Sequence, residues 1–248
     1  MQSLPIPCEA IRVFCGYAKP DLDRATFFKG VGETFMPGTP YMLQPLGLAA
    51  YLPGVLASPP PGLPDEFALI CYPSVAIWDR CMHDTLRGRV YNQSHGGVYA
   101  TTSGAAFPKR LADLADGTPG PFYLFDRPID WQSGQTHVAI AARGTSHDDG
   151  AAFRTDLHGW MRANGPGFAA QGFDQVIVTA ADAFCIMWFH GHAPGQAPDL
   201  AALAGIILDP VVMANERIVC IDEPPPVTLD GNRAFNFVFV RDERYFLD

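Results

Sequence analysis

The order of strand-like and helix-like segments in the first half of this chain recurs in the second half, and this recurrence restricts the possible folds more than any single motif. The first half opens with "IRVFCGYA" at 11–18, a short apolar run rich in β-formers, and continues with a helical pattern at 23–36. An extended segment, a buried strand, a second helix and a short strand follow at 42–56, 65–75, 76–95 and 96–102. The predicted order is strand, helix, strand, strand, helix, strand.

The second half shows the same order. A strand at 136–144 precedes a helix at 149–165, and two strands, "FDQVIVTAAD" and 183–193, come next. An apolar helix interrupted by Pro210 is predicted at 199–215, before a strand at 217–223. One further strand is appended to each half, at 121–131 and at 235–246. The pattern predicts an α+β protein with two ferredoxin-like βαββαβ repeats, 1–131 and 132–248.

A βαββαβ unit forms an antiparallel sheet with both helices on one face, so its other face is apolar and needs a cover. Two such sheets placed face to face cover each other and are expected to enclose a cavity between them. This architecture resembles the dimeric α/β-barrel superfamily, here fused into one chain as a pseudo-dimer. The segment "FMPGTPYMLQPLGLAAY" at 35–51 is similar to the loop region of the EthD-like members.

The resemblance implies a range of activities. Its families include antibiotic-type cofactor-free monooxygenases, muconolactone-type isomerases, polyketide cyclases and a haem-binding chlorite-dismutase group, and a shared fold does not choose among them. The axial histidine of the haem-binding relatives lies on a helix of the C-terminal half. The predicted helix 199–215 contains no histidine, which disfavours haem, although His158 lies on the other helix. No cofactor is therefore expected.

Three histidines of the second half are the first candidates for chemistry. His190 and His192 alternate along one predicted strand, so both side chains point to the same face. His137 begins the strand expected to lie antiparallel beside it, and the three are predicted to converge at one sheet edge. Such a group could act in acid–base catalysis or bind a divalent metal, with Asp182 as an available carboxylate, or it could simply face solvent.

The second candidate is "RGRVYNQSHGGVY" at 87–99, in which Arg87, Tyr91 and His95 are spaced four residues apart. On one continuous helix, Tyr91 and His95 would lie opposite an apolar stripe and face solvent. The stripe consists of Trp78, Met82, Leu86 and Val90. A helix that ends early at its glycines would instead turn the pair inward. Tyr91 could then bond a carbonyl while His95 moves a proton, and Arg87 could hold a carboxylate.

Aromatic residues of the predicted strands could line a pocket for a flat or apolar ligand, or could belong to the core. These residues are Tyr17, Tyr72 and Trp188.

Composition excludes several classes of protein. With a net charge of -9, a pI near 5.1 and no run of Lys and Arg, the chain is not expected to bind nucleic acid. No apolar run reaches the ~20 residues of a membrane span, and no secretion signal is recognised. Six scattered cysteines without a CxxC pair favour reduced thiols and a cytoplasmic location.

These features together favour a cofactor-independent lyase, isomerase or cyclase that uses acid–base catalysis on a small hydrophobic or aromatic carbonyl compound. Two alternatives stay open. One is a metal-dependent oxygenase or hydrolase that uses His137, His190 and His192. The other is a protein that binds a small ligand without converting it. A monomer and a homodimer are both compatible with the predicted pseudo-dimer.

Overall fold

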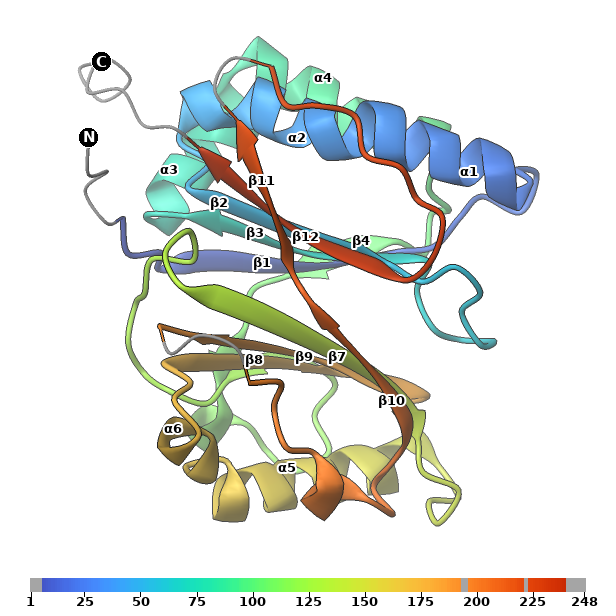
Figure 1. Cartoon of the computed structure of the whole chain (residues 1–248), viewed down its shortest axis with the longest axis vertical. Helices are drawn as coiled ribbons and strands as arrows, with labels where there is room; N and C mark the ends of the chain where they lie inside the picture. Colours follow the sequence, from blue (N-terminus) through green and yellow to red (C-terminus); the bar gives the residue numbers. More distant parts are fainter. Residues whose placement is uncertain (1–5, 193–195, 221–222, 240–248) are drawn as a thin grey trace.

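Two six-stranded mixed sheets are stacked face to face, and helices cover the outer face of each (Figure 1). The computed structural model describes residues 6–192, 196–220 and 223–239. In sheet order, sheet I contains β11 (Glu216–Cys220), β12 (Arg233–Phe239), β2 (Ala50–Val55), β3 (Glu66–Tyr72), β1 (Ala10–Gly16) and β4 (Gly104–Ala106). Sheet II contains β10 (Ile207–Ala214), β7 (Gln135–Arg143), β9 (Phe184–Gly191), β8 (Gln175–Ala180), β6 (Gly120–Tyr123) and β5 (Lys109–Arg110).

Most of the helical structure lies on sheet I. The outer face of sheet I is covered by α1 (Arg24–Gly30), α2 (Met36–Leu43), α3 (Val75–Asp79) and α4 (Leu86–Ser94), and that of sheet II by α5 (Gly150–Asn164) and α6 (Gly167–Ala170). Two π-helical turns, η1 (Val31–Phe35) and η3 (Arg80–Asp84), and four 3₁₀ turns, η2 (Gln44–Leu46), η4 (His95–Gly97), η5 (Leu111–Asp113) and η6 (Ala201–Leu203), complete the helical elements of the described residues. No helix in this part of the chain is both long and apolar enough to span a membrane.

Both sheets contain the strand order of a ferredoxin-like unit. The order is β4-β1-β3-β2 in sheet I and β10-β7-β9-β8 in sheet II, so in each case the first strand lies between the fourth and the third. The α+β class and the face-to-face sheets are therefore as predicted. The division of the chain at 131/132 stays a prediction.

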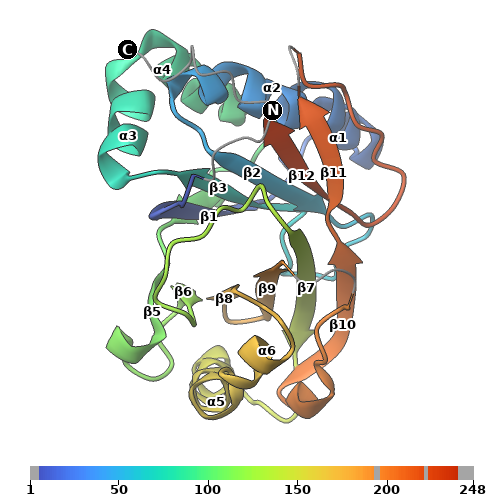
Figure 2. The same cartoon turned by 60° about the vertical axis from the view of Figure 1, so that its left-hand side comes forward.

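The two appended strands join the opposite sheets. β6, predicted to extend over 121–131, is shorter and pairs with β8 of sheet II. β12 pairs with β2 of sheet I, and the last part of the predicted strand 235–246 lies outside the described residues. The chain also passes from β10 in sheet II directly to β11 in sheet I (Figure 2). Each half thus contributes backbone hydrogen bonds to the sheet of the other half.

The prediction of a helix at 199–215 is wrong. Most of this segment is β10, an edge strand that pairs with β7. An edge strand tolerates Pro210 because the N–H that proline lacks is not needed on the free side. A β-bulge between Leu208 and Val211, with Asp209 at a φ of 42°, accommodates the irregularity.

Apolar side chains of both sheets fill the middle of the space between them, and open hollows lined by residues of both sheets lie beside this cluster. The cluster includes Ile11, Val13, Leu52, Leu69, Val138, Ile140, Ile186 and Trp188. Phe67 of sheet I and Trp188 of sheet II meet edge to face, with ring centroids 6.0 Å apart. The middle of the inter-sheet layer is therefore a packed core.

Candidate functional site

The helix predicted at 76–95 is broken at Thr85, and this break decides which side chains face the protein. Thr85 has extended backbone angles (φ −99°, ψ 144°) and caps α4, with its Oγ1 accepting from the N–H of Gly88 at 2.9 Å. The helical phase therefore changes between η3 and α4. Leu86 and Val90, predicted to continue the apolar stripe, are 71% and 47% exposed.

The same change turns Tyr91 inward and leaves His95 half-buried. The sequence alternative expected this from an early helix end at the glycines, whereas the cause is the break at Thr85. Gly88 allows this close packing, since a Cβ at this position would lie 2.0 Å from the carbonyl oxygen of Cys81. Arg87 is exposed and does not line the same pocket as Tyr91 and His95.

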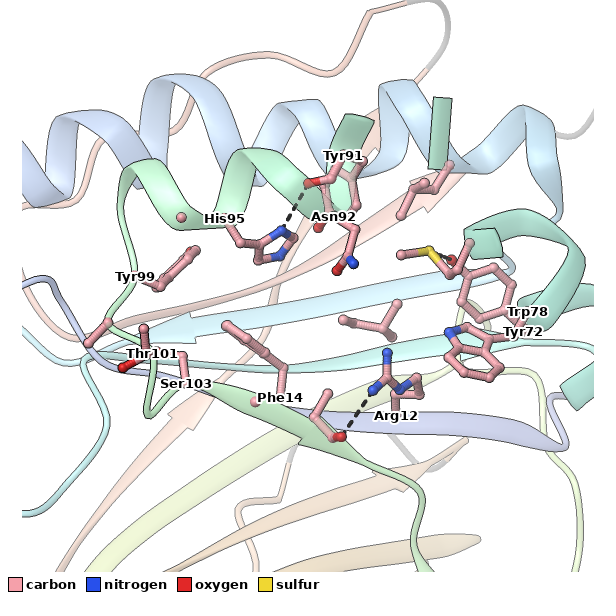
Figure 3. A pocket seen from close by; sticks show the side chains of 17 residues that line it. Arg12, Phe14, Tyr72, Trp78, Tyr91, Asn92, His95, Tyr99, Thr101 and Ser103 are labelled. Carbon is pink, nitrogen blue, oxygen red and sulfur yellow. Dashed lines mark hydrogen bonds between the residues drawn. The ribbon is translucent and has the colours of Figure 1, made fainter. Parts of the chain in front are cut away.

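A pocket of about 350 Å³ lies between α4 and the outer face of β1 and β3 (Figure 3). The lining residues that Figure 3 labels are Arg12, Phe14, Tyr72, Trp78, Tyr91, Asn92, His95, Tyr99, Thr101 and Ser103. The walls are mainly apolar and include several aromatic rings, and the polar side chains are those of Arg12, Asn92, His95, Thr101 and Ser103. A site of this size and character suits a small ligand with an apolar body.

His95 is held in one orientation within this pocket. Its Nδ1 lies 3.0 Å from the carbonyl oxygen of Tyr91, which can only accept, so Nδ1 carries the proton and Nε2 is the basic nitrogen. The rings around it have centroids 4.8 to 5.8 Å away and belong to Phe14, Phe35, Tyr91 and Tyr99. Burial lowers the pKa of His95, which keeps the imidazole neutral at pH 7.

Arg12 brings a positive charge to the same pocket. It projects from β1, donates from Nη2 to the carbonyl oxygen of Ala105 at 3.0 Å, and stacks on Trp78 at 4.8 Å (Figure 3). Its Nε is buried without a hydrogen-bond partner, and no carboxylate among the described residues pairs with it. Burial lowers the pKa of the Arg12 guanidinium. Sequence reasoning missed Arg12, although a cation inside the apolar run "IRVFCGYA" was a usable signal.

Two of the three pocket tyrosines, Tyr91 and Tyr99, have their hydroxyls bonded to the protein interior. Tyr91 Oη lies 2.7 Å from Thr39 Oγ1, which itself donates to the carbonyl oxygen of Phe35. Tyr99 donates to Glu66, a fully buried carboxyl that also accepts from Tyr51 at 3.3 Å. The Tyr91 hydroxyl proton is thus used within the protein and is not free to bond a substrate carbonyl, and Tyr91 and Tyr99 contribute their rings to the pocket.

The other predicted substrate-binding residues have different locations. Tyr72 lines the pocket, with its hydroxyl 3.7 Å from Cys81 Sγ. Trp188 lies in the packed layer between the sheets. Tyr17 lines a separate surface depression near Cys15 and Gly104. Only Tyr72 of these three is brought together with His95.

His190 and His192 lie together, with ring centroids 6.1 Å apart, but the strand register separates His137 from them. Thr136, not His137, lies opposite His190, so the His137 and His190 side chains point to opposite faces of sheet II. His192 is exposed and lies 3.9 Å from a carboxylate oxygen of Asp174. Among the described residues, no three His, Cys, Asp or Glu side chains are grouped so as to hold a metal ion.

His190 is expected to make the fold less stable below neutral pH. It is fully buried, with Nδ1 2.8 Å from Thr136 Oγ1 and Nε2 without a partner. Burial lowers the pKa of His190 from 6.5 to about 4, so the unfolded state binds more protons between these pH values. The free energy of unfolding is therefore expected to fall by about 3 kcal/mol as the pH drops from 7 to 4.

Urea unfolding at several pH values measures this effect. We expect His190→Gln to lose much of the acid-dependent decrease, whereas the matched variant His192→Gln, at an exposed position, keeps it. Equal pH dependence in wild type and His190→Gln would contradict the assignment.

Comparisons with known proteins give little further information. No protein-family model and no curated protein sequence matches the chain. A solved structure described as a "putative monooxygenase" from Fusobacterium nucleatum aligns with 7% identity and a TM-score of 0.39, over 95% of this chain and 99% of that one. Another of the same description, from Lactobacillus acidophilus, aligns with 8% identity and a TM-score of 0.35, over 89% and 99%. At these scores neither likeness supports a conclusion about family or activity.

Proposed function

We propose that the chain is an enzyme that moves a proton on a small apolar or aromatic carbonyl compound bound between α4 and sheet I. The observation that carries the proposal is the state of His95. Its Nδ1 is fixed by the Tyr91 carbonyl, its burial favours the neutral ring, and no described residue bonds its Nε2. A neutral imidazole with one free basic nitrogen in a pocket can act as a general base.

The residues present suffice for an enolisation. Nε2 of His95 accepts a proton from the carbon next to the substrate carbonyl, and the electron pair of the broken C–H bond forms a C=C bond. The carbonyl π electrons move to its oxygen, which becomes negatively charged. Arg12 supplies the positive charge that stabilises this oxygen in a largely apolar pocket. Return of the proton to another carbon gives an isomerase, and attack of the enolate on a second carbonyl gives a cyclase.

We further infer that the chain is a duplicated ferredoxin-like unit in which only the first half retained a site. The shared strand order of the two sheets supports this. The helix-covered face of sheet II is packed with apolar side chains, including Phe153, Phe168, Leu200 and Leu203. The space that corresponds to the pocket of sheet I is thus filled by the protein itself.

Deuterium exchange tests the proposed function. 1-Indanone and phenylpyruvate are incubated in D₂O with the protein, and deuterium at the carbon next to the carbonyl is measured by NMR. We expect exchange of at least one compound to exceed the buffer rate with wild type. Ala105→Phe, whose larger side chain occupies the pocket, is expected to reduce it to that rate. Equal exchange with wild type and with this variant would argue against a reaction in the pocket.

A further inference from the structure

We propose that the pocket binds a small 2-oxo acid with an apolar or aromatic tail, whose carboxylate pairs with Arg12. We infer the carboxylate group of the ligand from Arg12 and the residues around it. The choice of a 2-oxo acid among carboxylates rests on the proposed function, because enolisation needs a carbonyl.

The first argument is the missing countercharge of Arg12. Buried and half-buried charges in proteins are generally paired, because an unpaired charge loses its hydration without compensation. Arg24, Arg154 and Arg162 follow this rule through ion pairs with Asp65, Asp182 and Asp116. Arg12 has no such partner among the described residues, and its Nε is buried without any acceptor. A bound anion would supply the missing charge.

The second argument is the orientation of the guanidinium. Trp78 lies 4.8 Å and Phe107 5.5 Å from its central carbon, and the Nη2 bond to Ala105 fixes one corner. The guanidinium has five N–H donors and only one described hydrogen bond, so it can donate to two oxygens at once. A rigid planar fork of this kind matches a carboxylate better than a point charge would.

The third argument concerns size and charge. The pocket of about 350 Å³ contains one guanidinium, and aromatic rings of Phe14, Tyr72 and Trp78 form much of its wall. One cation with an apolar wall suits a monoanion with a hydrophobic body. A phosphate ester, with its higher charge and three terminal oxygens, would call for more donors.

A 2-oxo acid also places its two oxygen functions side by side. The carboxylate is bound in the ground state, and the neighbouring keto oxygen gains negative charge when His95 removes a proton from the next carbon. The same guanidinium can then donate to both oxygens. Binding and transition-state stabilisation would share one residue, which explains why a single cation is sufficient.

Binding of benzoylformate tests this inference separately from the proposed reaction. Benzoylformate is a 2-oxo acid with no C–H bond next to its keto group, so it cannot be enolised. Its neutral amide, benzoylformamide, has nearly the same shape. Calorimetric titration of wild type is expected to show about ten- to a hundredfold tighter binding of the acid. Arg12→Gln should abolish this preference, Arg12→Lys should restore part of it, and His83→Gln, at an exposed position outside the pocket, should leave it unchanged.

Three results would overturn the inference: no binding of benzoylformate at millimolar concentration, equal binding of acid and amide by wild type, or a preference that persists in Arg12→Gln. Circular dichroism checks the fold of each variant, and Arg12→Lys provides the test if Arg12→Gln does not fold. If wild type prefers benzoylformate to its amide but catalyses no deuterium exchange above the buffer rate, the proposed function alone is contradicted.

Discussion

Replacement of His95 by glutamine is expected to lower the enzyme-dependent rate of deuterium exchange by about 10²- to 10⁴-fold, the usual contribution of a general base. Glutamine keeps a polar side chain of similar reach but cannot accept a proton near neutral pH. The surrounding rings of Phe14, Phe35, Tyr91 and Tyr99 remain, so binding of the substrate should change much less than turnover. The matched control is His83→Gln, since His83 is exposed on η3 and pairs with Asp79.

The pH profile adds a second criterion. Because burial lowers the pKa of His95, the base stays unprotonated at mildly acidic pH. Exchange by wild type and by His83→Gln should therefore decline only below the usual range of histidine. If His95→Gln exchanges deuterium at the wild-type rate, another group is the base. The same conclusion follows if the exchange rates of wild type and His95→Gln fall in the same way at acidic pH.

Replacement of Glu66 by glutamine is expected to remove a loss of stability that wild type shows as the pH rises. Burial raises the pKa of Glu66 from 4.5 to about 7, and hydrogen bonds from Tyr99 and Tyr51 only partly oppose this. Between these pH values the folded state binds more protons than the unfolded state. The free energy of unfolding should therefore decrease by about 3 kcal/mol from pH 4.5 to pH 8 through this residue.

Unfolding by urea at pH 5, 6, 7 and 8 checks this prediction. Glu66→Gln should lack the decrease, and Glu33→Gln, at an exposed position of η1, should retain it. His190 acts in the opposite direction below pH 6.5, so each residue is evaluated as a difference between wild type and its own variant. A variant Glu66→Gln that loses stability between pH 5 and 8 as wild type does would contradict the assignment.

Single helices and strands with a clear hydrophobic periodicity could be predicted from the sequence. The helix predicted at 149–165 is α5, capped by Asp149 through the N–H of Ala152, and the strand predicted at 136–144 is β7. The apolar segment 199–215 was assigned wrongly, because an irregular edge strand and an apolar helix cannot be separated by hydrophobicity alone. The apolar residues around Pro210 follow neither the period of a helix nor that of a strand.

The candidate site depends on strand register, helix capping and side-chain packing, which a sequence shows less directly than it shows single helices and strands. His137 is separated from His190 by a register of one residue, which reverses the face of a strand side chain. Tyr91 and His95 turn inward because of a cap at Thr85, a residue whose role emerges only in the folded chain. The filling of the inter-sheet space by Trp188 and its neighbours depends on side-chain volumes across two sheets.

The most direct measurement is deuterium incorporation into phenylpyruvate and 1-indanone by wild type, His95→Gln and His190→Gln in parallel. A site between α4 and sheet I predicts that only His95→Gln loses exchange of the compound that wild type converts. Loss in His190→Gln with normal exchange in His95→Gln would contradict this account and place the reaction at sheet II.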